Sequence, residues 1–130
     1  MSMGERIRVL LVDDHVIVRQ ALSRLLHGEP DLEVVGEASE GREAVGMTRQ
    51  IVPDVVIMDV SMRGMNGIEA TRVIHAELPS VQVIGLSMYD EREQGEAMRE
   101  AGAVNYVSKM GPSDALIAAI RACRPGGTAS

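Results

Sequence analysis

A chain of 130 residues is long enough for one domain with an ordinary hydrophobic core. The single cysteine, Cys123, excludes an internal disulfide, and no apolar run approaches the roughly 20 residues of a membrane helix; we therefore expect a reduced, cytoplasmic setting and no membrane partner. A net charge of −6 argues against direct binding of nucleic acid, which requires a basic surface.

Apolar runs and helically spaced apolar residues alternate along the chain. The runs predict strands, of which the third ends at Asp59, and the helical spacings predict helices between them. The expected strands cover 6–12, 32–36, 54–59, 81–86 and 104–107. The expected helices cover 18–26, 41–50, 66–78, 90–101 and a last segment from 113.

Local signals mark the ends of several of these helices. Asn66 followed by Glu69 has the spacing of a capping box, and Ser113 is placed to cap the last helix. Gly102 is the expected C-terminal glycine of the fourth helix, whereas Gly67 is expected in a turn. In the first helix, Arg19 and Ser23 fall on the face predicted to be exposed.

Strict alternation of strands and helices predicts an α/β protein with a parallel sheet covered on both faces. Five strands are too few for a TIM barrel, so an open, doubly wound five-stranded sheet with five helices is expected. We expect one domain over residues 6–124, a disordered segment at 1–5 and a linker or truncation point at 125–130.

Polar residues stand at the C-terminal ends of four expected strands. They are Asp13, Asp14, Asp59, Ser87 and Lys109. In an open parallel sheet, ligands bind at this edge, where the strand order reverses, so these residues are expected to converge on one crevice.

This set of residue types predicts phosphoryl chemistry. Three neighbouring carboxylates repel one another unless a cation joins them, and their oxygens suit a Mg²⁺ ion. Lys109 adds a fixed positive charge and Ser87 a hydroxyl, which are groups that neutralise and position a phosphoryl group in transfer. Asp59, the lone acid of the third strand, is the expected nucleophile and would form an aspartyl phosphate.

The chain resembles the receiver domain of two-component response regulators over about residues 6 to 124. The motifs that carry the resemblance are Val12–His15, Ile57–Val60, Met65–Gly67, Leu86–Met88 and Tyr106–Lys109. Leu11–His15 together with Met88–Arg92 is similar to the NarL/LuxR-type subfamily in particular. The resemblance implies a flavodoxin-like fold with strand order 2-1-3-4-5.

The resemblance also implies a role for each site residue. Asp59 would accept a phosphoryl group from a sensor histidine kinase, Lys109 would neutralise its oxygens, and Ser87 would hydrogen-bond it. Mg²⁺ would be held by Asp14, Asp59 and the Ser61 carbonyl, with Asp13 acting through water. Ser87 and Tyr106 would form the switch that alters the face made by the fourth helix, fifth strand and fifth helix, which is also a plausible dimer interface.

The sequence departs from the family pattern at three positions. Arg63 and Met110 stand where receivers usually have proline, and Met88 is bulkier than the usual small residue. The three histidines lack the spacing of metal ligands, although His15 lies beside the acids and could tune them.

Two other functions compete with a phosphorylation switch. A phosphatase using an aspartyl phosphate would need a second acid two residues after the nucleophile, where this chain has Ser61, so we expect no enzyme activity beyond the chain's own phosphorylation and dephosphorylation. A scaffold that is never phosphorylated would not need all five site residues. The NarL/LuxR resemblance implies a DNA-binding output domain absent from this chain, and a stand-alone regulator acting through protein contacts is the alternative.

Overall fold

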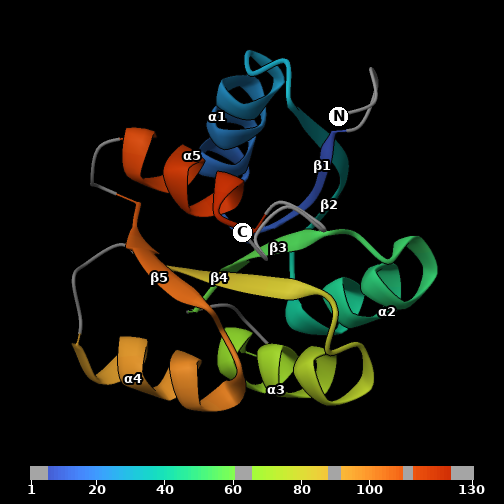
Figure 1. Cartoon of the computed structure of the whole chain (residues 1–130). Helices are drawn as coiled ribbons and strands as arrows, with labels where there is room; N and C mark the ends of the chain where they lie inside the picture. The colour runs from blue at the N-terminus through green and yellow to red at the C-terminus, as the bar shows by residue number, and fades with distance from the viewer. Residues whose placement is uncertain (1–5, 61–65, 88–91, 110–112, 124–130) are drawn as a thin grey trace.

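The computed structural model describes residues 6–60, 66–87, 92–109 and 113–123. Its strands are β1 (Ile7–Val12), β2 (Leu32–Ala38), β3 (Val55–Asp59), β4 (Gln82–Ser87) and β5 (Asn105–Ser108). Its helices are α1 (Val16–His27), α2 (Gly41–Ile51), α3 (Gly67–Glu77), α4 (Arg92–Ala101) and α5 (Ser113–Arg121). The strands form one parallel sheet in the order β2-β1-β3-β4-β5, so the predicted doubly wound α/β fold is confirmed (Figure 1).

The helices cover both faces of the sheet. Figure 1 shows α1 and α5 on one face and α2, α3 and α4 on the other. Side chains of β1 alternate between the two faces, with Leu10 and Val12 in the core beneath α2, α3 and α4, and Val9 and Leu11 in the core beneath α1 and α5. Because both faces are buried, β1 and β3 read as continuous apolar runs.

The predicted capping signals are confirmed where the structure describes them. The Asn66 side chain accepts a hydrogen bond of 2.9 Å from the Glu69 backbone N–H at the start of α3. Gly102 follows α4 with φ +119°, a conformation that L side chains rarely adopt. α5 begins at Ser113 itself, so its cap lies outside the described residues.

The structure corrects three local predictions. Gly67 is the first residue of α3 rather than a turn residue, because a Cβ there would collide with the Asp59 carbonyl and only glycine lets α3 begin against the end of β3. β2 continues to Ala38, since residues beyond a register shift still pair with the end of β1. Ser23 is buried, and its small side chain lies 3.3 Å from His27 Nδ1 within α1.

Candidate functional site

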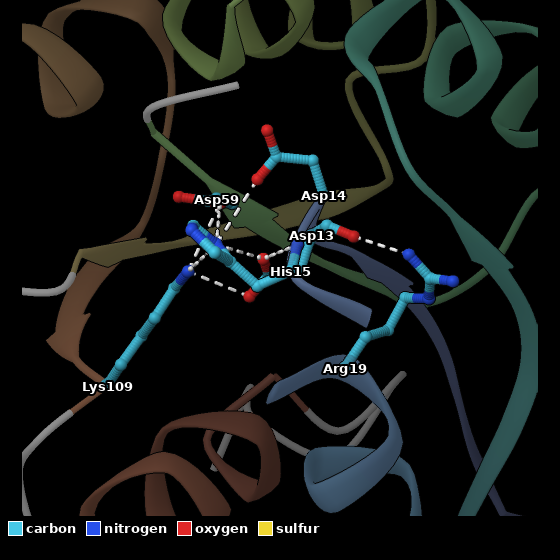
Figure 2. A network of polar contacts seen from close by, with 6 residues as sticks. All are labelled: Asp13, Asp14, His15, Arg19, Asp59 and Lys109. Atoms are coloured by element: carbon cyan, nitrogen blue, oxygen red, sulfur yellow. Dashed lines mark hydrogen bonds and ion pairs between the residues drawn. The ribbon is translucent and has the colours of Figure 1, made fainter. Parts of the chain in front are cut away.

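The carboxyl ends of three strands bring the predicted site residues together (Figure 2). Asp13 and Asp14 follow β1, Asp59 ends β3, and Lys109 follows β5. β1 and β3 are hydrogen-bonded neighbours, which places their terminal acids side by side. Lys109 is tied down by its backbone N–H, which donates a 2.6 Å hydrogen bond to the Ser87 carbonyl at the end of β4.

The Lys109 ammonium bridges two carboxylates. Its Nζ lies 2.8 Å from Asp13 Oδ2 and 3.1 Å from Asp59 Oδ2. The Lys109 side chain is only 4% exposed, and the two aspartates are buried as well. Removing one member of such a buried ionic group leaves an uncompensated charge, so all three belong to one electrostatic unit.

Burial and the neighbouring Lys109 and His15 both affect the pKa of Asp13. Burial alone would raise the pKa, because a charged carboxylate is poorly solvated inside a protein. The Lys109 ammonium and the hydrogen bond from the His15 backbone N–H outweigh burial, and the pKa of Asp13 lies below its ordinary value. Asp13 is therefore a carboxylate at neutral pH and can serve a cation.

His15 belongs to the same cluster, although the sequence did not predict it as a metal ligand. Its Nδ1 lies 3.0 Å from Asp13 Oδ1, 3.2 Å from Asp14 Oδ1 and 3.8 Å from Asp59 Oδ2. The Lys109 Nζ is 3.5 Å from the same nitrogen. Ligand spacing along the sequence could not reveal this arrangement, because the contact depends on how the chain turns between β1 and α1.

Arg19 supports the cluster from outside, and the sequence placed it only on an exposed helix face. Its guanidinium donates a 2.6 Å hydrogen bond to the Asp13 carbonyl (Figure 2). The same group lies 3.0 Å from Glu37 Oε1. The hydrogen bond to Asp13 fixes the backbone of the loop that carries the first two acids.

Tyr106, the predicted switch residue, is held in a narrow slot. A Cβ added to Gly85 of β4 would lie 2.7 Å from its ring, and one added to Gly95 of α4 would lie 2.9 Å from it. Met98 of α4 lies beside the same slot. The ring therefore fills the space between β4 and α4.

Ser87, the other switch residue, is buried at the end of β4. The remaining residues singled out in the sequence lie outside the described residues: Ser61, Arg63, Met88 and Met110.

The donor set fits a divalent cation. Asp13, Asp14, His15 and Asp59 each offer one ligand atom, and these atoms lie within 4.8 Å of one another. Asp13 Oδ2 and Asp14 Oδ1 are buried; the first faces the Lys109 ammonium at 2.8 Å and the second His15 Nδ1 at 3.2 Å. Buried oxygens of this kind suit a hard cation that brings its own waters.

None of the helices in the described part of the chain combines the length and apolar character that a membrane span requires.

A doubly wound parallel sheet with three aspartates and a lysine at its carboxyl edge defines the receiver class of α/β protein. The chain belongs to the response regulator receiver domain family, whose model matches residues 9–121. It is 43% identical over 120 residues to the transcriptional regulatory protein LiaR of Bacillus subtilis, covering 92% of this chain and 57% of LiaR. The chain thus spans about half the length of the curated relatives that it matches.

Solved structures place the chain in the NarL/LuxR-type group. The signal receiver domain of the response regulator NarL from Mycobacterium tuberculosis matches with a TM-score of 0.88 and 28% identity, covering 95% of this chain and 99% of that one. A two-component response regulator of the LuxR family from Aurantimonas matches with a TM-score of 0.88 and 37% identity, covering 93% and 86%. The family resemblance found in the sequence is confirmed, and membership does not make the chain an ordinary enzyme.

Proposed function

We propose that Asp59 accepts a phosphoryl group from a phosphohistidine of a sensor histidine kinase. A carboxylate oxygen of Asp59 forms the new O–P bond while the P–N bond to the kinase breaks and its electron pair returns to the imidazole. The observation that carries this assignment is the contact of 3.1 Å between Asp59 Oδ2 and Lys109 Nζ at the centre of a cluster of acids. Among these acids, Asp59 alone ends the central strand β3.

The surrounding residues neutralise and hold the phosphoryl group. Lys109, already bridging Asp13 and Asp59, offers its ammonium to phosphoryl oxygens, and Ser87 donates its hydroxyl from the end of β4. Asp14, Asp59 and the Ser61 carbonyl would hold Mg²⁺, and Asp13 would act on it through water. When bound, Mg²⁺ supplies positive charge against the phosphoryl oxygens and keeps the three carboxylates compatible. The chain catalyses only its own phosphorylation and dephosphorylation.

Phosphorylation then switches an output surface. It adds about −1.5 to −2 charge beside Ser87, and movement of Ser87 and Tyr106 carries the change to the face of α4, β5 and α5. The slot of Tyr106 between Gly85 and Gly95 supports this route, since the ring cannot move without changing how α4 packs. The same face is the proposed homodimer interface.

The wider setting follows from the family. We infer a receiver domain at residues 6–124, with short flanking segments at 1–5 and 125–130, working in the cytoplasm without a membrane partner. Because the chain covers only 57% of LiaR, we favour a receiver that controls a DNA-binding C-terminal output domain in a longer transcription regulator. A single-domain regulator acting through protein contacts is the alternative.

Labelling with acetyl phosphate and Mg²⁺ tests the phosphoacceptor. The chain is expected to gain one phosphoryl group by intact-mass measurement, and Asp59→Asn is expected to gain none. Asp114→Asn, which removes an exposed acid in the first turn of α5, is the charge-matched control and should label like the parent. Equal labelling of Asp59→Asn and the parent would overturn the assignment.

A further inference from the structure

We propose that His15 joins Asp14 and Asp59 as a side-chain ligand of this metal site and turns the site toward divalent ions such as Co²⁺ and Ni²⁺, relative to Mg²⁺. The inference rests on the proposed function for the location of the metal site. It adds a nitrogen donor to a site otherwise made of oxygens, and so gives the site a preference that its carboxylates alone would not have.

The spacing of the ligand atoms carries the proposal. Neighbouring ligands of an octahedral ion with bonds of about 2.1 Å stand about 3.0 Å apart, and opposite ligands about 4.2 Å apart. His15 Nδ1 lies 3.2 Å from Asp14 Oδ1 and 3.8 Å from Asp59 Oδ2, the two proposed side-chain ligands, and it hydrogen-bonds to Asp13 Oδ1 at 3.0 Å. The imidazole nitrogen and the carboxylate oxygens are thus already spaced like ligands of one ion.

The backbone and the imidazole of His15 both contact Asp13 Oδ1. Its N–H donates a 2.8 Å hydrogen bond to Asp13 Oδ1, which folds the residue back over the acids. It occupies the N-cap of α1 with an extended conformation, and its side chain makes no capping hydrogen bond. The partner of the His15 ring is an acid of the site itself, since Nδ1 hydrogen-bonds to Asp13 Oδ1 at 3.0 Å, whereas His27 Nδ1 lies 2.7 Å from the Ser23 carbonyl oxygen of its own helix.

The site is open to ions from solvent. The His15 side chain is 52% exposed, and a hollow of about 450 Å³ beside it is lined by Asp14, His15, Ser39 and Glu40. Two of these four residues are acids, so the hollow attracts cations. Inside the cluster, the buried Asp13 Oδ2 faces the Lys109 ammonium at 2.8 Å and the buried Asp14 Oδ1 faces His15 Nδ1 at 3.2 Å, and each carboxylate oxygen keeps a further lone pair for an ion.

The donor chemistry decides which ions gain from His15. Imidazole binds Co²⁺, Ni²⁺, Cu²⁺ and Zn²⁺ readily, whereas Mg²⁺ takes oxygen ligands and keeps several waters. Mg²⁺ therefore needs only oxygen ligands, and its affinity should depend little on His15. The Lys109 ammonium, 3.5 Å from Nδ1, repels all divalent ions alike and so does not alter the ratio of their affinities.

Titration calorimetry of the untagged chain with Mg²⁺ and with Co²⁺ tests the proposal, comparing His15→Ala with His27→Ala as the matched control. We expect His15→Ala to lower the ratio of Co²⁺ to Mg²⁺ affinity by about tenfold or more, since losing even an outer-shell partner of a metal ligand costs about 10–100-fold in affinity. His27→Ala should leave the ratio within about twofold of the parent. The visible absorption of bound Co²⁺ should also move to longer wavelength in His15→Ala, because water or carboxylate replaces a stronger-field nitrogen.

Three results would overturn the inference. They are an unchanged affinity ratio in His15→Ala, an equal loss in His27→Ala, and an unchanged Co²⁺ spectrum. Failure of the proposed function looks different, because Mg²⁺ would then not bind the parent chain or Asp59 would not be labelled. Normal Mg²⁺ binding and labelling with an unchanged ratio refutes the role of His15 alone.

Discussion

Alanine substitutions at two helical glycines should change stability in opposite directions. In a helix interior, glycine to alanine ordinarily stabilises a protein by about 0.5–1 kcal/mol. At Gly46 of α2, an added Cβ meets nothing within 4 Å, so Gly46→Ala should show this gain. At Gly95 of α4, the added Cβ would lie 2.9 Å and 3.3 Å from two carbons of the Tyr106 ring.

The Tyr106 ring has little room to move away from a methyl group at Gly95. On its other side lies Gly85, where an added Cβ would be 2.7 Å from the ring. Overpacking of this kind costs about 1–3 kcal/mol, which exceeds the helix gain, so Gly95→Ala should destabilise the fold by up to about 2.5 kcal/mol. In a chain of 130 residues, 1 kcal/mol corresponds to a Tm shift of about 3–5 °C.

Urea unfolding followed by far-ultraviolet circular dichroism provides the assay, since the chain has no Trp to report by fluorescence. The decisive comparison measures Gly95→Ala again in a Tyr106→Ala variant, in which the obstructing ring is absent. There the substitution should stabilise by about 0.5–1 kcal/mol, giving a coupling energy of about 1–3 kcal/mol between the two positions. A Gly95→Ala variant that is as stabilised as Gly46→Ala would refute the packing of Tyr106 against α4.

Three further predictions concern strain, charge and pH. Val52 has φ +49°, a backbone conformation that strains a β-branched residue and that asparagine tolerates, so Val52→Asn should stabilise the fold by about 1 kcal/mol in thermal unfolding. Val104 is also an exposed valine but does not have positive φ, so the control Val104→Asn should give no comparable gain. Lys109→Met should lower the unfolding free energy in urea by about 3–5 kcal/mol without metal, with part regained on adding Mg²⁺; no loss would contradict the buried ion group. The fold lowers the pKa of Asp13 from its ordinary value of 3.8, so the contribution of Asp13 to the free energy of unfolding is present above pH 3.8 and is lost as the pH falls through the lower folded pKa. Asp13→Asn should therefore weaken the loss of stability in acid. An unchanged dependence of stability on acidic pH would contradict this prediction.

The architecture was predictable because it depends on patterns that sequence displays directly. Buried parallel strands read as apolar runs, and each predicted strand is present within one or two residues of its expected ends. The convergence of Asp13, Asp59 and Lys109 follows from the same pattern, since residues after parallel strands meet at one edge of the sheet. Family motifs then identified the class of protein.

Features that depend on exact chain paths were not predictable. The contact of His15 with the acids follows from a backbone hydrogen bond to Asp13, and spacing rules for metal ligands do not include it. Arg19 was predicted on an exposed helix face, because its contact with the Asp13 backbone carbonyl leaves no mark in the sequence. Gly67 carried an ambiguous signal, since glycine serves turns and close approaches equally well, and only the proximity of the Asp59 carbonyl shows which applies.

The position of the phosphoryl group tests the central claim most directly. After treatment with acetyl phosphate and Mg²⁺, borohydride reduction converts an aspartyl phosphate to homoserine, and peptide mass spectrometry then locates the changed residue. Our account predicts homoserine at position 59 and at no other aspartate. Homoserine at position 13 or 14, or none in a folded chain that binds Mg²⁺, would contradict it.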